Sequence, residues 1–537
     1  MRKLFVFSLS FIFFISLYAQ EKQNQNVELP DFVITGKNVV NMQSVNKKAP
    51  PVLEIISKNF LQPVYSTENL KVVNIKSKTI NPFTFKKKAE VFNGGAVLKG
   101  GIYSIPQGSL FLSKPFSNGI FQFNIDGANM RAHVKNSDYT SVNGSAGLTF
   151  FVKNNSDILP GTKISFKGSY GTRKYKFYAT ANPSKRTLNK GRVSLTIQNL
   201  LSKYFVFNAE VSNDFHQLKD ENFKENLLSI NGFAKISLAK FDVASNIIYK
   251  KQILTNNLNS NSKRQPNYLF VNPRANLNFI DNFKVSLGFT YSHVTGNNYY
   301  APYASVSIGL GSSVTLVGEY SPKADLITQG MLIDKNKYFD TSFFTNLFFK
   351  KTNSINISLK YEYLKFFEMD LGFNYYSSPN QPYYGINYEI LVLRLASRFD
   401  LLTASAKSYS GYVKLLLNPG DYGLLTAILK YHSLKDDFGK RIPYNPLFNI
   451  SIKYLFNYNE NISIEPSVKY NSSTYADLAN RVEINSFIDL SIKISKRVNN
   501  NLELFLEGTN LLNHSNFIYS GYKQLPISVG GGIKLRW

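Results

Sequence analysis

The sequence predicts an all-β protein, a transmembrane antiparallel up-and-down β-barrel of about 22 strands (roughly 20–24). Three observations predict this fold. Apolar and polar residues alternate along segments of about 9–12 residues, the length that tilted membrane strands need. The chain has no run of about 20 apolar residues that would form a spanning helix. Aromatic residues make up 15% of the 537 residues, which excludes a disordered chain.

Residues 1–19 have the pattern of a secretory signal peptide. A positive start at residues 1–3 precedes an uncharged apolar run over residues 4–17, and Ala19 offers a cleavage site before Gln20. The alternative, an uncleaved membrane anchor, would need a longer run. We therefore expect the mature chain to leave the cytoplasm. Cysteine is absent, which excludes disulfides and thiolate metal sites.

Residues 20–92 differ in composition from the rest of the chain. They contain the diprolyl step Pro50-Pro51 and the lysine cluster at residues 86–88, and their short apolar stretches show no sustained period. We expect an extended, partly ordered leader over this range.

Residues 93–537 are predicted to form the barrel. A soluble sandwich would produce the same alternation with strands of about 5–6 residues. The longer segments here, with Tyr and Phe near their ends, favour strands that face lipid. Apolar residues take every second position in five clear segments: residues 283–291, 355–363, 448–454, 462–470 and 488–494.

The connections indicate how the barrel is oriented. Membrane barrels have short periplasmic turns and long external loops, and both kinds alternate toward the C-terminus. We therefore expect both termini on the periplasmic side, which requires an even strand number. At about 20 residues per strand and connection, 445 residues (537 − 92) give about 22 strands. The long connections are residues 252–267, 321–340, 434–443, 471–482 and 511–524, and the short ones are 418–422, 457–461 and 498–501.

A motif near the C-terminus is more specific than the alternation. Two strand patterns, residues 486–494 and 501–509, are followed by Asn510, Leu511, Leu512 and Asn513, a Tyr-bearing loop and a closing strand. This order resembles the C-terminal end of TonB-dependent outer-membrane receptors of Gram-negative bacteria. The resemblance implies a 22-stranded barrel in the outer membrane, uptake of a bulky ligand, and energy supplied by TonB.

The N-terminal side matches that family only in part. A hexapeptide after the signal peptide resembles a TonB box: Asp31, Phe32, Val33, Ile34, Thr35 and Gly36. The bland alternative is an ordinary β-prone segment. Only residues 37–92 separate it from the barrel, whereas the plug domain of the family is about twice as long. We therefore expect the plug to be missing or truncated.

The closing strand alternates apolar residues and ends on an aromatic one. Val529, Ile533, Leu535 and Trp537 form this row, which resembles the insertion signal that the barrel-assembly machinery recognises. The same row also suits an ordinary last strand facing lipid.

The charge is uneven along the chain. Residues 1–270 contain 36 basic and 15 acidic residues, and residues 271–537 contain 26 and 20. A basic interior would favour anionic solutes, and a basic rim would favour outer-membrane lipid and acidic lipopolysaccharide. Nine basic residues concentrate in one stretch: Lys163, Lys167, Arg173, Lys174, Lys176, Lys185, Arg186, Lys190 and Arg192.

We expect no catalytic residues, metal ligands, cofactor or nucleic-acid partner. None of the histidines pairs with another at metal-ligand spacing, and we expect surface positions for all five: His133, His216, His293, His432 and His514. The preferred hypothesis is uptake of a bulky or anionic ligand across the outer membrane. The alternatives are a plugless barrel that scaffolds a periplasmic or surface partner, and a passive, anion-preferring pore.

Overall fold

The computed structural model describes most of the chain after residue 91, and all structural statements below concern that part. The signal peptide, the leader to residue 91 and the TonB-box-like hexapeptide lie outside it. The described residues are 92–153, 160–180, 182–200, 202, 204–238, 241–256, 262–280, 282–311, 313–341, 347–364, 366–385 and 398–537.

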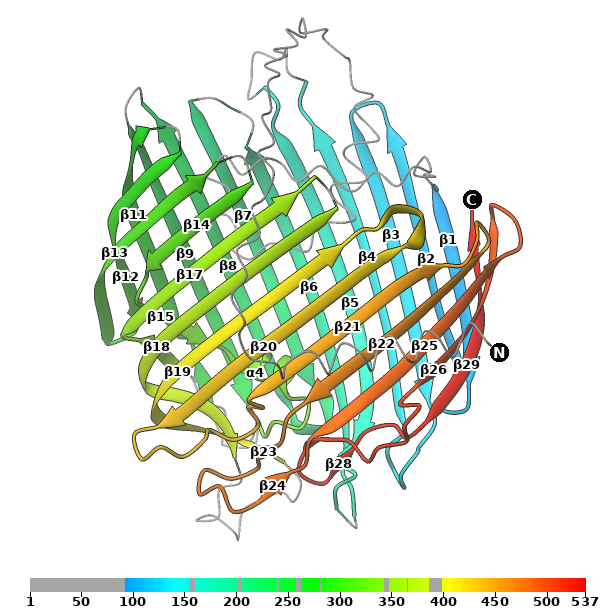
Figure 1. The fold of residues 1–537 in the computed structure, drawn as a ribbon. Coiled ribbons are helices and arrows are strands. Elements are labelled where there is room, and N and C mark those ends of the chain that lie inside the picture. The colour runs from blue at the N-terminus through cyan, green and yellow to red at the C-terminus, as the bar shows by residue number, and fades with distance from the viewer. Residues whose placement is uncertain are drawn as a thin grey trace, which may run out of the picture. The chain divides into compact units, whose positions relative to one another are not determined.

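The described residues form a closed barrel of 22 antiparallel strands, as the sequence predicts (Figure 1). Each strand pairs with its neighbours in the chain, and the short β10 (Ser262–Arg264) only extends the hairpin of β9. The barrel strands are β1 (Gly94–Gly101), β2 (Ser104–Phe116), β3 (Gly119–Met130), β4 (Tyr139–Phe151), β5 (Lys163–Lys176), β6 (Lys185–Asn199), β7 (Phe205–Leu218), β8 (Phe223–Ser237), β9 (Phe241–Asn256), β11 (Asn267–Ile280), β12 (Phe283–Val294), β13 (Asn297–Leu310), β14 (Val314–Tyr320), β17 (Asn353–Tyr363), β18 (Phe367–Gly385), β19 (Asp400–Leu417), β20 (Leu424–Asp436), β21 (Phe448–Asn457), β22 (Ile462–Asn471), β25 (Phe487–Arg497), β26 (Leu502–Thr509) and β29 (Ser528–Arg536).

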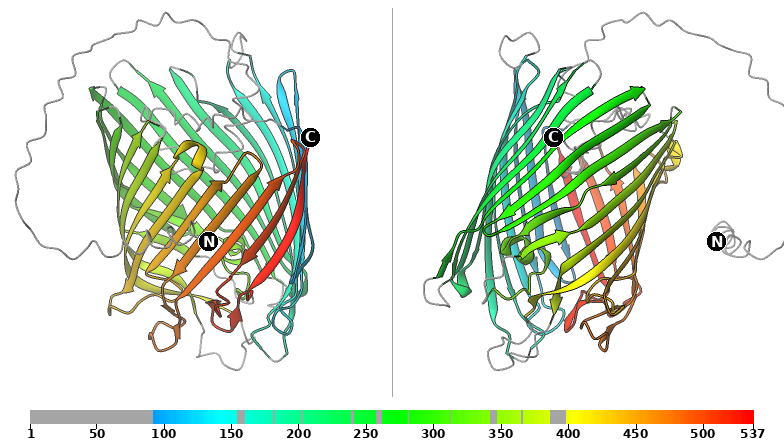
Figure 2. Two further views of the ribbon diagram at one scale, coloured as in Figure 1. Left: turned by 45° about the vertical axis from the view of Figure 1, so that its right-hand side comes forward. Right: turned by 90° about the vertical axis from the view of Figure 1, so that its left-hand side faces the viewer.

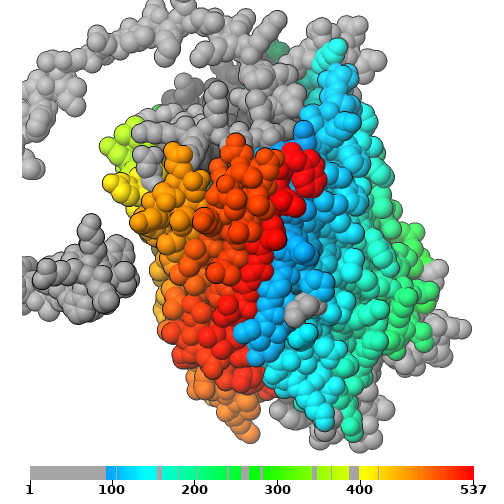
Figure 3. Space-filling model, turned by 90° about the vertical axis from the view of Figure 1, so that its right-hand side faces the viewer, coloured from blue at the N-terminus to red at the C-terminus, as the bar shows by residue number. Residues whose placement is uncertain are grey.

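The first and last strands close the ring. β1 pairs with β29 over seven residue pairs, from Gly95 opposite Arg536 to Gly101 opposite Gly530. The start of β1 and the end of β29 therefore lie at the same end of the barrel, which we call the terminal end; we call the opposite one the loop end. Figure 3 shows this face of the barrel, with β29 in red beside β1 in blue.

Long connections collect at the loop end, and most connections at the terminal end are short (Figures 1 and 2). The described parts of all five long segments predicted from the sequence lie at the loop end. The loop-end connections that include these segments carry three small hairpins and the helix α4 (Gln329–Lys335). The hairpins are β15 (Lys323–Ile327) with β16 (Leu347–Lys351), β23 (Thr474–Tyr475) with β24 (Glu483–Ile484), and β27 (Phe517–Tyr519) with β28 (Tyr522–Lys523); the 3-10 helices are η1 (Lys219–Glu221) and η3 (Gly420–Tyr422).

The outer face of the wall is apolar, as the alternation predicts. Phe166 and Tyr170 of β5 and Val193 of β6 are about half exposed on this face. Lys167 and Ser169, which alternate with them on β5, face the interior of the barrel. Among the described residues, no helix has the length and apolar character to cross a membrane. Several strands are longer than predicted, up to 19 residues in β18. Their extra residues continue the ladder beyond the apolar band, where the alternation no longer marks them.

The seam between β29 and β1 depends on glycine. An added Cβ at Gly532 would lie 2.5 Å from the carbonyl oxygen of Leu98 and 2.5 Å from the ring of Phe505. We predict that Gly532→Ala lowers the free energy of unfolding by about 1–3 kcal/mol, because the closing ladder must shift. Urea unfolding in lipid vesicles measures this change. Gly318→Ala is the matched control, since no atom lies within 4 Å of a Cβ there. Equal stability of both variants would contradict the prediction.

Candidate functional site at the mouth of the barrel

The connection between β14 and β17 folds across the loop end. We call its described residues, 321–341 and 347–352, the inner loop. Its helix α4 contacts β7 and β8 on one side, and Tyr384 of β18 donates a hydrogen bond to the carbonyl oxygen of Leu332 (2.9 Å). Six strands stand between β8 and β18 on the shorter way round the ring. A segment that reaches both must cross the mouth, and Figures 1 and 2 show α4 within the ring of strands.

The helix rests on a row of three polar side chains. Lys190, His216 and Glu225 are cross-strand neighbours on β6, β7 and β8. Asp334 of α4 pairs with Lys190 Nζ (3.0 Å) and His216 Nε2 (3.3 Å). The amide of Gly330 donates to Glu225 Oε2 (2.7 Å). Any side chain at position 330 would collide with this row, because its Cβ would lie 2.6 Å from His216 Nδ1.

A buried carboxylate holds the far side of the inner loop. Glu221 of η1 accepts from Arg186 of β6 (Nη2, 2.7 Å) and from Arg398 before β19 (Nη1, 2.5 Å). Thr341 of the inner loop donates its hydroxyl to the same carboxylate. We call these four residues the Glu221 clasp. Arg186 also donates to the carbonyl oxygen of Lys337 (2.8 Å), so the clasp binds the inner loop at two points.

The charges around Glu221 stabilise its ionised carboxylate. Burial alone would raise the pKa of Glu221, but Arg186, Arg398 and the Thr341 hydroxyl together hold it below its ordinary value. Arg186 is fully buried, and Glu221 and Arg398 are each 6% exposed. Buried ion pairs tolerate removal of one partner poorly, because the remaining charge is left in a low-dielectric site.

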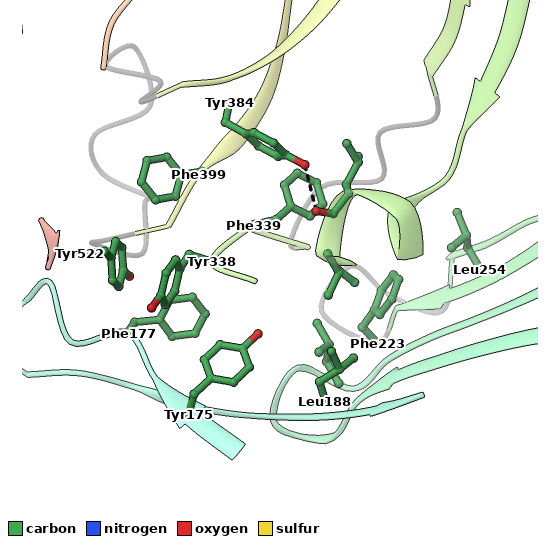
Figure 4. Packing of buried hydrophobic residues seen from close by; sticks show 13 residues of the cluster. Tyr175, Phe177, Leu188, Phe223, Leu254, Tyr338, Phe339, Tyr384, Phe399 and Tyr522 are labelled. Carbon is green, nitrogen blue, oxygen red and sulfur yellow. Dashed lines mark hydrogen bonds between the residues drawn. The ribbon is translucent and has the colours of Figure 1, made fainter. Parts of the chain in front are cut away.

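Aromatic side chains join the inner loop to other loops. Tyr338 stacks on Tyr522 of β28 with ring centroids 3.5 Å apart, and Tyr178 meets Tyr522 edge-on at 5.0 Å. Figure 4 shows the rings of Tyr338 and Tyr522 beside those of Phe177 and Phe399. The loops after β5, β14, β18 and β26 therefore share one core. The buried cluster contains Tyr175, Phe177, Leu188, Leu218, Phe223, Leu254, Leu332, Ile333, Tyr338, Phe339, Tyr384, Phe399 and Tyr522.

The accessible surface of the inner loop is basic. Lys335 and Lys337 are exposed, and the ammonium of Lys337 lies 5.0–5.6 Å from the ring centroids of Tyr139, Tyr175 and Tyr338. The surrounding protein and the nearby Arg173 lower the pKa of Lys337 to about 8. Because no described carboxylate forms an ion pair with Lys337, its charge is available to an anion.

The sequence-predicted residues fall into three groups. The TonB-box-like residues 31–36 lie outside the described part. Val529, Ile533 and Leu535 point outward on β29 and, like Trp537, are 44–48% exposed. The remaining group, the Asn510–Asn513 motif, forms the turn that starts the loop after β26.

Two asparagines shape that turn. Asn510 and Asn513 have positive φ values of 48° and 52°, which asparagine tolerates better than most residues. Asn510 donates to the carbonyl oxygens of His514 (2.9 Å) and Leu525 (3.0 Å), and Asn513 accepts from the amide of Ile527. The motif thus fixes both ends of the loop between β26 and β29.

One expectation about the histidines is wrong. His216 is buried at 8% exposure, because α4 covers its position on the inner wall. Among the residues that the structure describes, no group of three or more His, Asp or Glu side chains is placed to hold a metal ion.

The sequence analysis missed α4 and the clasp. The sequence does contain one signal for the helix, a threonine at position 328 shortly before the apolar pair Leu332-Ile333. In the structure Thr328 is the N-cap and its hydroxyl accepts from the amide of Met331 (3.3 Å). Glu221 and Arg398 gave none, because they are 177 residues apart and lie in connections without periodicity.

We predict that Glu221→Ala loosens the inner loop. The substitution leaves the buried Arg186 without its carboxylate partner and leaves Arg398 only the more distant Asp340 (3.9 Å). Loss of one partner costs about 3–5 kcal/mol in buried pairs. Hydrogen exchange at the amides of residues 330–336 should become faster. Asp138→Asn is the control, because it removes only the exposed pair with Lys176. Unchanged exchange in Glu221→Ala would show that the clasp does not hold α4.

Comparisons of fold and sequence place the barrel among known proteins. No family model matches the chain, and no curated protein matches it in sequence. Solved structures do match. A mutant of the ferric enterobactin receptor PfeA from Pseudomonas aeruginosa is 10% identical, with a TM-score of 0.62 over 83% of this chain and 80% of that chain. The ferric-catecholate import receptor Fiu from E. coli K12 is 10% identical, with a TM-score of 0.63 over 83% and 82%.

The copper transporter OprC is 9% identical, with a TM-score of 0.61 over 84% of this chain and 82% of that chain. Identities this low establish the architecture. The protein has the barrel fold of TonB-dependent siderophore and copper receptors.

Proposed function

We propose that the protein is an outer-membrane import receptor, with the inner loop as the movable closure of its mouth. In this proposal both termini face the periplasm and the loop end faces the outside. A bulky ligand binds among the outer loops, the inner loop withdraws, and the ligand passes through the barrel.

The observation that carries this proposal is the crossing of the mouth by a loop with specific attachments. The inner loop reaches both sides of the ring, through Glu225 on β8 and Tyr384 on β18. A scaffold has no need of such a crossing, and a passive pore is obstructed by it. The fold likeness to siderophore and copper receptors supports the same choice.

The ligand is proposed to be anionic. Lys335 and Lys337 are exposed on the inner loop, and Arg173 stands near Lys337 on the inner wall. Tyrosine rings surround Lys337 and offer flat contact surfaces with polar edges. A metal chelate with acidic groups, or an acidic oligosaccharide, has both the negative charge and the flat surface that would match these cations and rings. Charge-assisted hydrogen bonds from ammonium and guanidinium groups are the expected contacts.

Two parts of the chain are proposed to meet other proteins. Residues 31–36 would bind TonB as a TonB box, and the outward row ending at Trp537 would serve the barrel-assembly machinery. The exposure of Val529, Ile533 and Leu535 on one side of β29 supports the second assignment.

Planar-bilayer conductance tests the closure. We predict that full-length protein conducts little, and that Gly330→Leu raises conductance because the new side chain cannot fit against His216. Both proteins are also measured without residues 20–91. If conductance appears only when Gly330→Leu is combined with deletion of residues 20–91, the leader and the inner loop each obstruct the barrel. A reversal potential in a KCl gradient should show anion preference.

The control for that experiment is Met331→Leu, which changes an exposed side chain of the same helix. High conductance of the unaltered full-length protein would identify a passive pore. If Gly330→Leu and the parent protein conduct equally when both lack residues 20–91, the inner loop does not close the barrel and that part of the proposal is rejected.

The TonB assignment has a separate test. We predict that Ile34→Pro abolishes crosslinking between the protein and the periplasmic domain of TonB, because proline removes a backbone donor from an added strand. Ile75→Pro, elsewhere in the leader, should leave crosslinking intact. Crosslinking that survives Ile34→Pro rejects residues 31–36 as the TonB box.

A further inference from the structure

A histidine lies between two carboxylates beneath α4. His216 of β7 contacts Asp334 of α4 through Nε2 (3.3 Å), and its cross-strand neighbour on β8 is Glu225. Lys190 of β6 is its neighbour on the other side. We call Lys190, His216, Glu225 and Asp334 the α4 seat. Each of the four residues belongs to a different element, so the seat joins the inner loop to three strands of the wall.

Two buried polar atoms of the seat have no hydrogen-bond partner among the described residues, His216 Nδ1 and Glu225 Oε1. A Cβ added at Gly330 would lie 2.6 Å from the first atom and 3.0 Å from the second, so both atoms border the same space beside the helix. When His216 is neutral and its Nε2–H donates to Asp334, Nδ1 is an acceptor without a hydrogen. Buried acceptors without a donor are costly.

A proton on His216 removes this conflict. The imidazolium has a donor at both ring nitrogens. Nε2 then keeps its contact with Asp334, and Nδ1 presents a donor on the side of Glu225. The amide of Gly330 still donates to the other oxygen of the Glu225 carboxylate (2.7 Å). Protonation of His216 therefore strengthens the attachment of α4 to the wall.

The charged groups around His216 act in the same direction. They are Lys190 and Arg192 of β6, Asp214 of β7, Glu225 of β8 and Asp334 of α4. Two cations stand against three carboxylates, and Arg192 is also shared with Glu210 farther along β7. A positive charge on His216 lowers the repulsion among these acids.

Asp334 itself stays ionised. Burial alone would raise the pKa of Asp334, but hydrogen bonds from His216 and Lys190 lower it to about 2. Above that pH the carboxylate is charged, so a change of charge on His216 changes the strength of an existing ion pair.

We propose that the attachment of α4 is proton-dependent: the α4 seat holds the inner loop when His216 is protonated and releases it more readily when His216 is neutral. Imidazole is the side chain that ordinarily gains or loses its charge between about pH 5 and 8. A rise in pH through this range therefore loosens α4. The inference rests on the proposed closure of the mouth by the inner loop, and it adds a condition under which the mouth opens.

Hydrogen exchange of the full-length protein at about pH 5.5 and about pH 8 measures the attachment. Rates at the amides of residues 330–336 are expressed as protection factors, which removes the intrinsic dependence of exchange on pH. We expect protection to fall by roughly ten-fold from the lower to the higher pH, because an opposite charge within about 4–6 Å changes an equilibrium by that factor or more.

Two variants of the seat test the cause. His216→Gln keeps a hydrogen-bond donor but cannot gain a charge, so its protection should be equally low at both pH values. Glu225→Gln keeps an acceptor for the amide of Gly330 and adds a donor beside Nδ1 of His216, so its protection should fall less than that of the parent.

Two other histidines provide matched controls. His514→Gln changes an exposed histidine in the loop after β26, and His432→Gln changes a histidine of β20 that lies near Lys335 of α4. Both variants should keep the ten-fold fall of the parent. Equal protection of the parent at the two pH values, or an unchanged fall in His216→Gln, overturns the proposal. Loss of the fall in His432→Gln alone would assign the pH dependence to that histidine, which also overturns it.

Exchange and conductance together separate this inference from the proposed closure. If protection depends on pH through His216 while Gly330→Leu leaves conductance unchanged, the attachment is proton-dependent but the inner loop does not close the mouth. If Gly330→Leu raises conductance while protection is the same at both pH values, the closure stands and the proton-dependent attachment is rejected.

Discussion

Closure of the sheet by β1 and β29 is the constraint on which the rest of the structure depends. A backbone in hydrocarbon must satisfy its own hydrogen bonds, so a sheet there has no free edge. The closing ladder joins Gly100 to Gly531 and Gly101 to Gly530. Glycines on both sides let the two backbones approach while Phe505 covers the inner side of Gly532. The ring thus formed gives the loops a fixed frame.

That frame sets the chemistry of the mouth. The closed ring brings Arg186 of β6 together with Glu221 and Arg398 of two loop-end connections. Each of these buried charges would be costly alone, and the three stabilise one another. The Glu221 clasp then holds Thr341, and through it the inner loop. Polar attachments of this kind depend on geometry more than apolar packing does. They therefore suit the role proposed for the inner loop, a segment with one closed position that is released when a ligand passes.

Local patterns predicted the wall, and could not predict the mouth. The period-two rows of residues 355–363 and 488–494 are decided by which face meets lipid, a property of neighbouring residues. The long connections could also be assigned to one end of the barrel, because short turns alternate with them along the chain. The clasp depends on partners that the chain brings together only after the ring closes, such as Glu221 and Arg398. Lys174 points outward and Arg173 inward because successive residues of a strand face opposite sides. The sequence analysis nevertheless grouped both residues in one basic stretch, since it counted charges without dividing them by face.

The stack of Tyr338 on Tyr522 links loops that belong to distant hairpins. Tyr178 and Phe399 touch the same ring, so four loops share one contact surface. Motion of the inner loop must therefore separate rings that other loops hold in place. Through these contacts, a displacement of any one of the four loops would disturb the packing of the other three. In the proposed import cycle, opening of the mouth therefore requires these shared ring contacts to break together, which favours a closed and an open position over a partly open one.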